Sequence, residues 1–405
     1  MQDGLPRYGA SVADFGARGD GTADDAPAIQ RALDEGVPLV VIPEGVYRIG
    51  QTLRIGSGTR LVAHPRALIR LADGAGTDAG VFLLTNKGHA AGDVEIEVRG
   101  GIWDGNNPGN RRGPDGPADS YTGVALNFVN TCRLRLRDLT VRDPESFFIR
   151  IGEVRDFVIE RIRLEAPHLR PNQDGIHVGG FCEEGVIRDI EAVGPGCPND
   201  DMVALNADDD VRRAINLGMR CGPIRDVRVE SLSAADAYTF VRLLSQDSPL
   251  EDVEVRGVRG GCRYHAINMN RWRFPPGRGA IRRVRIADLD VRKHTSPNAD
   301  ALIDLALGAE EVTLVDCRRP ADGRPEVATL AVHTGRKSRV VVEGLEHDQV
   351  AGLQTASTVA GLRVLRLAGA EPPERYRVEA GIPPEGCLSL PAGGFDRVTL
   401  NSGFA

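Results

Sequence analysis

The segment Val158-Ile-Glu-Arg-Ile162 returns 28 residues later as Val186-Ile-Arg-Asp-Ile190, and a further copy is Val227-Arg-Val-Glu-Ser-Leu232. From Leu139 to Val258, the last apolar residues of successive copies are 23, 28, 42 and 26 residues apart. This spacing is too irregular for a propeller, and no helices lie between the copies as a doubly wound sheet requires. The repeat predicts an all-β fold, a single-stranded right-handed parallel β-helix (solenoid), in which each coil buries its apolar face against its neighbours.

A second strand in each coil is an apolar-x-apolar triplet, such as Ile149-Arg-Ile151 or Ile176-His-Val178. Alternation along a strand turns the two apolar residues inward and the middle residue outward. If the triplets stack, the outward column reads Asn127, Arg150, His177, Ala204, Arg242, Asn268 and Asp304. Two arginines and a histidine around one small residue indicate a binding groove rather than a solvated face.

Aspartates occupy the same position in two neighbouring coils. Asp174 and Asp201 each lie three residues before the middle of a triplet, and Asp200 adds a third carboxylate. Adjacent parallel strands are about 4.8 Å apart, so these groups can act on one sugar. Like charges this close raise at least one pKa, which lets one carboxyl act as an acid and another as a base. Either segment alone, residues 172–175 or 199–201, is more typical of a turn. Their matching register favours catalysis.

The acidic segments also carry a family resemblance. Asn172-Gln-Asp-Gly175, Asn199-Asp-Asp-Met-Val-Ala-Leu205 and Phe240-Val-Arg-Leu243 resemble, in this order, the active-site motifs of the polygalacturonases, family 28 of the glycoside hydrolases. Gly100-Gly-Ile-Trp-Asp-Gly-Asn106 resembles the glycine-rich coil before that site. Residues 14–25 resemble the opening of the broader pectin-lyase-like superfamily, which supports the fold more than the reaction.

The resemblance implies inverting hydrolysis of a uronate-containing, pectin-like polysaccharide or oligosaccharide without a cofactor. By matching position, Asp200 is the general acid, while Asp174 and Asp201 activate the attacking water. Arg242 matches the arginine that binds the substrate carboxylate, a task suited to a planar guanidinium. The other residues predicted to bind substrate are Arg150, Asn172, His177, His265 and Asn268.

Two departures from the family pattern argue against ordinary homogalacturonan as the substrate. The family normally has a Gly-His-Gly segment after the paired aspartates, but the corresponding residues 219–223 contain no histidine. The lysine that normally follows the arginine by two positions is Leu244 here. His177 or His265 could replace the missing histidine in space.

Two alternative functions use the same residues. In a calcium-dependent polysaccharide lyase, Asp200, Asp201 and residues 208–210 would hold the ion, and Arg242 or Arg150 would abstract a proton. A non-catalytic carbohydrate-binding or tailspike-like solenoid would bind without turnover, although no trimerising segment is recognisable. The paired carboxylates favour the hydrolase.

A single helix is expected over about residues 25–35, where it would cap the N-terminal end of the solenoid. Its apolar stripe is Ile29, Ala32 and Leu33. The predicted domains are a β-helix over residues 1–370, including this cap, and an extended arm over residues 371–405 that packs on the solenoid. Loops at residues 106–120 and 208–217 would decide whether cleavage occurs within a chain or at its end.

Composition narrows the choice of partner. The 50 basic and 57 acidic residues give a net charge of −7 and are mixed along the chain, which argues against nucleic-acid binding. No apolar run approaches the ~18 residues of a membrane span. The seven cysteines include no Cys-x-x-Cys pair, so neither a zinc site nor a disulfide framework is indicated. An aromatic content of 5% favours recognition by charge, and therefore an acidic polysaccharide.

No secretory signal is recognisable, so the expected location is secreted or periplasmic if such a signal was removed, and cytoplasmic otherwise.

Overall fold

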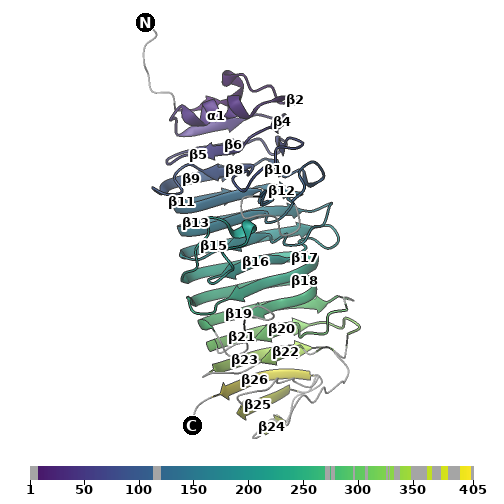
Figure 1. Cartoon of the computed structure of the whole chain (residues 1–405). Helices are drawn as coiled ribbons and strands as arrows, with labels where there is room; N and C mark the ends of the chain where they lie inside the picture. The colour runs from purple at the N-terminus through teal and green to yellow at the C-terminus, as the bar shows by residue number, and fades with distance from the viewer. Residues whose placement is uncertain are drawn as a thin grey trace.

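Nearly every described segment is a strand that pairs with strands one coil earlier and one coil later. The computed structural model describes residues 8–112, 120–269, 274, 279–294, 297–305, 309–324, 327, 329–332, 338–347, 363–366, 375–381 and 393–402. All pairings up to β23 are parallel, and the coils follow one another along an elongated stack (Figure 1). The predicted parallel β-helix is therefore confirmed.

The coils build three stacks of paired strands. The first stack begins with β1 (Ala10–Ser11), β3 (Leu39–Ile42), β6 (Arg60–Ala63) and β9 (Asp93–Arg99). The second begins with β2 (Asp20–Asp24), β4 (Val46–Ile49), β7 (Leu68–Leu71), β10 (Ile102–Asp104) and β12 (Thr140–Arg142). The third contains β5 (Leu53–Ile55), β8 (Leu84–Asn86), β14 (Ile176–Val178), β16 (Asp201–Asn206), β20 (Ile303–Leu305) and β22 (Leu330–Val332).

Longer strands bend from one stack into the next. They are β11 (Leu126–Arg137), β13 (Ile149–Glu165), β15 (Cys182–Val193), β17 (Ile224–Leu244), β18 (Pro249–Met269), β19 (Ala280–Lys293) and β21 (Ala309–Arg319), and β23 (Ser338–His347) pairs with β21. Inward side chains of all three stacks form one continuous apolar core, as the alternating sequence requires.

Single left-handed residues turn the chain from the first stack into the second. Asp189 in β15 and Ser231 in β17 both have φ of 56°. Non-glycine residues adopt this conformation rarely, yet every coil from β11 to β21 supplies one residue for this corner. The corner column is Asp138, Arg161, Asp189, Ser231, Gly257, Asp288 and Asp316. The recurring phrase in the sequence is thus a first-stack strand, its corner and the start of a second-stack strand.

The N-terminal end of the core is covered by α1 (Ala26–Asp34), inside the range predicted for the helix. Ile29, Ala32 and Leu33 are buried against the first coils, as the apolar stripe predicts. Three short 3-10 turns also occur, η1 (Val12–Phe15), η2 (Asn107–Gly109) and η3 (Ala214–Asn216). No helix in the described ranges is both long and apolar enough to cross a membrane.

Three further strands lie at the C-terminal end of the stack (Figure 1). They are β24 (Arg363–Arg366), β25 (Arg375–Gly381) and β26 (Gly393–Ser402). β26 pairs antiparallel with β23 and parallel with β25. Much of the predicted arm, residues 371–374, 382–392 and 403–405, lies outside the described residues. The boundary at residue 370 stays a prediction.

Candidate active site

The third stack aligns the outward side chains that the triplets predict. Strand register joins them one coil at a time. The column runs Asn127, Arg150, His177, Ala204, Arg242, Asn268 and Asp304. Its side chains are more enclosed than a solvated face, because Arg150 and His177 are each only 2% exposed.

The three predicted aspartates meet on two neighbouring coils. Asp174 lies just before β14, and Asp200 and Asp201 lie at the start of β16. The amide of Gly175 donates to the Asp201 carbonyl at 2.9 Å, which fixes the two coils side by side. Asp174 and Asp201 are 4% and 2% exposed. The sequence register therefore brings two buried carboxyl groups together with the partly exposed Asp200.

Burial sets the protonation of this cluster. It raises the pKa of Asp174 and of Asp201 well above the usual value for aspartate, and neighbouring carboxylates add to the effect. Burial also raises the pKa of Asp200, although Arg242 and the Asp201 amide, which donates to Asp200 Oδ1 at 3.0 Å, act in the opposite direction. The cluster therefore retains protons at a pH where isolated aspartates have lost theirs.

Arg242 approaches the carboxylates from the following coil, on β17. Its Nη1 atom lies 3.5 Å from Asp201 Oδ2. Burial opposes its charge, but the attraction of Asp201 and Asp200 outweighs this and raises the pKa of Arg242. Within the described part of the chain, Arg242 Nε and Asp201 Oδ1 are buried without a hydrogen-bond partner. Buried polar atoms are usually satisfied, so this edge of the cluster is suited to a ligand or water.

His177 joins the cluster through Asp174. Its Nδ1 atom lies 2.8 Å from Asp174 Oδ2, and its Nε2 atom lies 3.5 Å from Asp209 Oδ2. Its ring stacks on Phe147 at a centroid distance of 4.1 Å. Burial lowers the pKa of His177 to about 4, so the imidazole is neutral at neutral pH. His177 therefore orients Asp174, while its predicted contact with substrate stays a prediction.

The other predicted binding residues differ in their surroundings. Arg150 donates through Nη1 to the carbonyl of Ile215 at 2.5 Å and through Nε to Asn127 at 2.8 Å. Asn172 lies beside the cluster, with Nδ2 3.5 Å from Asp200 Oδ2. His265 and Asn268 lie farther along the stack. Both are buried, and His265 Nδ1 is 2.8 Å from the carbonyl of Ala301. The structure thus groups Asn172, His177 and Arg242 with the aspartates, places Arg150 on the coil just before Asp174, and places His265 and Asn268 on the coil after Arg242.

An aromatic pair beside the carboxylates was missed by sequence reasoning. Tyr238 and Tyr264 stack at a centroid distance of 4.0 Å, and Asp200 contributes to raising the pKa of Tyr238, whose main cause is burial. Each tyrosine lies one residue before a position in register with Asp201, so the pair continues the column that begins with Asp200. Reading the register one residue earlier would have found both rings.

Arg263 fixes the turn that carries Asp200. Its Nη2 atom donates to Asn199 Oδ1 at 2.9 Å and to the carbonyl of Gly196 at 3.0 Å. Its guanidinium also lies over the Tyr238 ring, 5.6 Å from the centroid. A side chain from β18 thereby holds the segment before β16 in place.

The acidic run at residues 208–210, which the lyase alternative assigns to calcium, is bonded within the protein. Asp208 accepts from the amides of Gln246, Asp247 and Ser248, each at 2.7 Å. Asp209 faces His177 and Asp210 pairs with Arg212 at 2.9 Å. Across the described residues, no group of three or more His, Cys, Asp or Glu side chains is arranged to hold a metal ion. A calcium requirement stays a prediction that a chelator tests.

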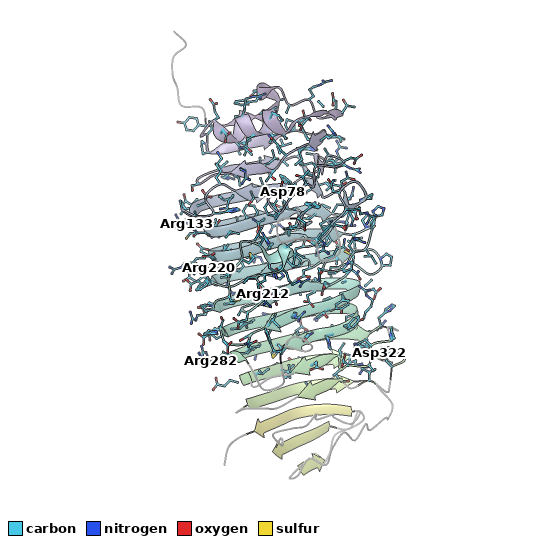
Figure 2. All side chains as sticks on the ribbon, in the orientation of Figure 1. Asp78, Arg133, Arg212, Arg220, Arg282 and Asp322 are labelled. Carbon is cyan, nitrogen blue, oxygen red and sulfur yellow. The ribbon has the colours of Figure 1, made fainter. Side chains whose placement is uncertain are left out.

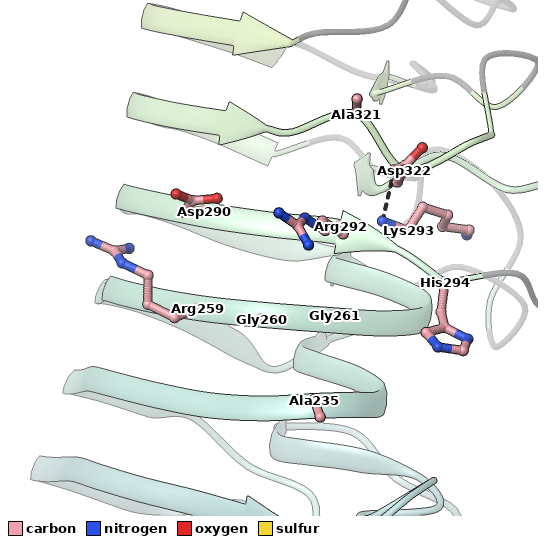
Figure 3. Close-up of a pocket in the computed structure, with 10 residues that line it drawn as sticks. All are labelled: Ala235, Arg259, Gly260, Gly261, Asp290, Arg292, Lys293, His294, Ala321 and Asp322. Atoms are coloured by element: carbon pink, nitrogen blue, oxygen red, sulfur yellow. Dashed lines mark hydrogen bonds between the residues drawn. The ribbon is translucent and has the colours of Figure 1, made fainter.

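A cavity of about 700 Å³ lies on the face formed by β17, β18 and β19 (Figure 3). It is lined by Ala235, Arg259, Gly260, Gly261, Asp290, Arg292, Lys293, His294, Ala321 and Asp322. Its charged groups bond to the protein itself. Lys293 Nζ donates to Asn298 at 2.8 Å, and Asp322 accepts from Arg319 at 2.7 Å. None of the residues predicted for the active site lines it.

Several known proteins are similar to this chain in sequence. A family described as rhamnogalacturonase A/epimerase, pectate lyase-like, matches residues 9–96. A polygalacturonase of Persea americana is 24% identical over 248 residues, which are 58% of this chain and 51% of that protein. A polygalacturonase of Gossypium barbadense is 24% identical over 302 residues, 71% of this chain and 68% of that protein. The preneck appendage protein of Bacillus phage PZA is 28% identical over 201 residues, 48% of this chain and 21% of that protein. The chain thus spans about half or less of the length of the first curated relatives that it matches.

Solved structures share the fold at low sequence identity. An exopolygalacturonase of Thermotoga maritima superposes with a TM-score of 0.54 at 14% identity, covering 86% of this chain and 94% of that one. The surface adhesin PfbA of Streptococcus pneumoniae superposes with a TM-score of 0.57 at 14% identity, covering 83% of this chain and 89% of that one. The A-module of an Azotobacter vinelandii mannuronan C-5 epimerase gives 0.53 at 12% identity, covering 83% and 89%. These solved structures share the fold of this chain, and the sequence matches show that it is similar to polygalacturonases.

Proposed function

We propose that this protein is a glycoside hydrolase that cleaves a uronate-containing, pectin-like polysaccharide or oligosaccharide with inversion at the anomeric carbon. The observation that supports the proposal most is the enclosed cluster of Asp174, Asp200 and Asp201 beside Arg242. Glycoside hydrolysis requires one carboxyl that gives a proton and another that takes one. The relatives named as polygalacturonases supply the substrate class.

In this proposal Asp200 protonates the glycosidic oxygen, and Asp174 and Asp201 deprotonate the attacking water. The three carboxyl groups titrate together, so their pKa directions alone do not separate the acid from the bases. Asp200 is assigned by its position in the family motif. Arg242 binds the carboxylate of the sugar through the guanidinium edge that faces no protein acceptor, and His177 keeps Asp174 in place.

The experiment is a reducing-end assay on a panel of uronate-containing polysaccharides, with proton NMR of the first product to read its anomeric configuration. Asp200→Asn is expected to lower kcat by about 100-fold or more on natural substrates. The kcat of this variant should fall much less on a uronide with an aryl leaving group, because such a group departs without being protonated. Asp247→Asn is the matched control, because Asp247 is an exposed acid that lies outside the cluster.

Other outcomes would replace the proposal. Full turnover by Asp200→Asn would remove the assignment of the acid. Unsaturated products that absorb in the ultraviolet and disappear with a chelator would make the protein a lyase. Binding without any product across the panel would make it a carbohydrate-binding solenoid.

A further inference from the structure

We infer that residues 207–219, here called the crossing loop, form a fixed wall on the N-terminal side of the carboxylates. The protein therefore cuts at the end of a polysaccharide chain rather than within it. This inference rests on the proposed function and specifies which part of the substrate the site accepts.

The column of side chains that contains Asp174 and Asp201 changes from apolar to acidic where the crossing loop covers it. Three residues before the middle of each triplet, successive coils carry Phe82, Val124 and Phe147, and the next two carry Asp174 and Asp201. The three apolar side chains form a small cluster outside the main core, and Ile215 of the crossing loop completes it. All four members are at most 5% exposed. The apolar half of the column is thus occupied by the protein's own loop, and no sugar can lie there.

Buried polar contacts hold the crossing loop in the same place. Arg150 is 2% exposed and donates to the Ile215 carbonyl, so a charged side chain is committed to the loop. Asp209 faces His177 at 3.5 Å. Arg213 donates to Asn172 at 3.1 Å, next to the catalytic cluster. The loop is therefore bonded to two successive coils of the third stack, the coil of β13 through Arg150 and the coil of β14 through Asn172 and His177.

Two glycines receive the end of the crossing loop. Met219 lies against Gly152 and Gly179, where an added Cβ would be too close to its Cε atom. The Met219 side chain therefore packs directly against the backbone of two neighbouring coils. Figure 2 shows Arg212 of the loop near the middle of the stack, in front of the coils that bear the site. Contacts at both ends and at Ile215 make this segment a built wall.

The wall leaves the substrate one direction in which to extend. The sugar at the carboxylates meets Ile215 and Asp209 on the side of the earlier coils. On the side of the later coils it meets Arg242 and the stacked pair Tyr238 and Tyr264, which are only partly buried. A polysaccharide must therefore present a terminus to the wall.

The test follows product length over time on oligouronides that carry a cap at the non-reducing end, at the reducing end, or at neither. The wild-type protein is expected to release one short product of constant length from the first time point. A cap at one of the two ends should abolish cleavage, while the other cap should have no effect. A ladder of internal fragments, or cleavage with both caps present, would overturn the inference and leave the proposed hydrolase intact.

Two variants test the wall itself. Ile215→Asp places a charge in the apolar cluster, and Arg150→Gln removes the buried anchor without doing so. Both are expected to add internal cleavage products, whereas Leu217→Asp, at a residue of the same loop that is 44% exposed, should keep the wild-type profile. If folded Ile215→Asp and Arg150→Gln both kept the wild-type profile, the loop would not be the barrier. If the wild type cleaved and bound none of the substrates, the proposed function would fail together with this inference.

Discussion

Arg242 brings a positive charge to the three aspartates, with its Nη1 atom 3.5 Å from Asp201 Oδ2. It differs from a lysine in geometry more than in charge, because its planar fork can grip both oxygens of a carboxylate. Its Nη1 atom already leans towards Asp201, and its Nε atom faces no acceptor in the described part of the chain. One guanidinium can therefore balance the aspartates and still present an edge to a uronate.

Arg242→Lys is expected to keep the fold and weaken recognition of the sugar carboxylate. Loss of a two-point contact predicts a fall in kcat/KM of about 10-fold or more on uronides. Reduced or methyl-esterified substrates, which lack the carboxylate, should be affected less. The measurement is kcat/KM on matched free and esterified oligosaccharides. An equal loss on both would mean that Arg242 supports Asp201 rather than the substrate.

At the level of elements, the strands of the third stack could be predicted because their pattern is local. Apolar-x-apolar triplets specify which residues face outward, and the register of Asp174 with Asp201 follows from counting. The tyrosine column obeys the same rule and could have been predicted too. The crossing loop could not, because the contact between Ile215 and Arg150 joins residues 65 positions apart. No short segment of the sequence specifies that an exposed-looking loop docks on Phe82.

Close stacking of coils makes a glycine in β18 indispensable. Gly260 has φ of 121°, and a Cβ there would overlap the carbonyl of Ala234 on β17. Gly260→Ala is therefore expected to destabilise the protein by about 2 kcal/mol or more. Gly194→Ala is the matched control, because Gly194 has φ of 96° with nothing within 4 Å of its added Cβ.

The control variant should lose only the cost of left-handed backbone, about 1 kcal/mol. Urea unfolding midpoints of the two variants and the wild type measure both effects. Equal losses in the two variants would mean that backbone conformation, and not the spacing of the coils, makes Gly260 necessary.

Across the whole molecule, two sets of carboxylates respond to pH in opposite directions. In the third stack, burial raises the pKa of Asp174, Asp200 and Asp201. At the corner between the first two stacks, Asp138 accepts from Arg161 Nε at 2.5 Å and from Arg99 Nε at 2.9 Å, and these arginines lower its pKa. Similar ion pairs between an arginine and a carboxylate lie along the side of the stack where Figure 2 labels Arg133 and Arg282. Low pH therefore stabilises the folded active site, whereas neutral pH stabilises the side of the stack that carries these arginine–carboxylate pairs.

This opposition predicts opposite effects of one chemical change at two places. Folding raises the pKa of Asp174. The contribution of Asp174 to the stability of the folded protein is therefore complete below the pKa that it has in the unfolded chain, and it is lost as the pH rises through the pKa that it has in the folded protein. Asp174→Asn should therefore stabilise the protein at neutral pH by about 1–2 kcal/mol while abolishing turnover, and the gain should vanish in acid. The lowered pKa of Asp138 has the opposite effect, because its contribution to stability is present at neutral pH and is lost as the pH falls through the pKa of the folded protein. Asp138→Asn should cost up to about 1 kcal/mol at neutral pH and nothing below the folded pKa, and asparagine tolerates the left-handed corner.

Melting temperatures of the wild type and both variants between about pH 3 and pH 8 decide the matter, because this range spans the ordinary aspartate pKa. The two differences from wild type should have opposite signs at neutral pH and should both shrink as the pH falls. If Asp174→Asn melted below the wild type at neutral pH, its carboxylate would be stabilised by its neighbours rather than strained. The protein would then carry no stability cost for keeping three carboxyl groups together.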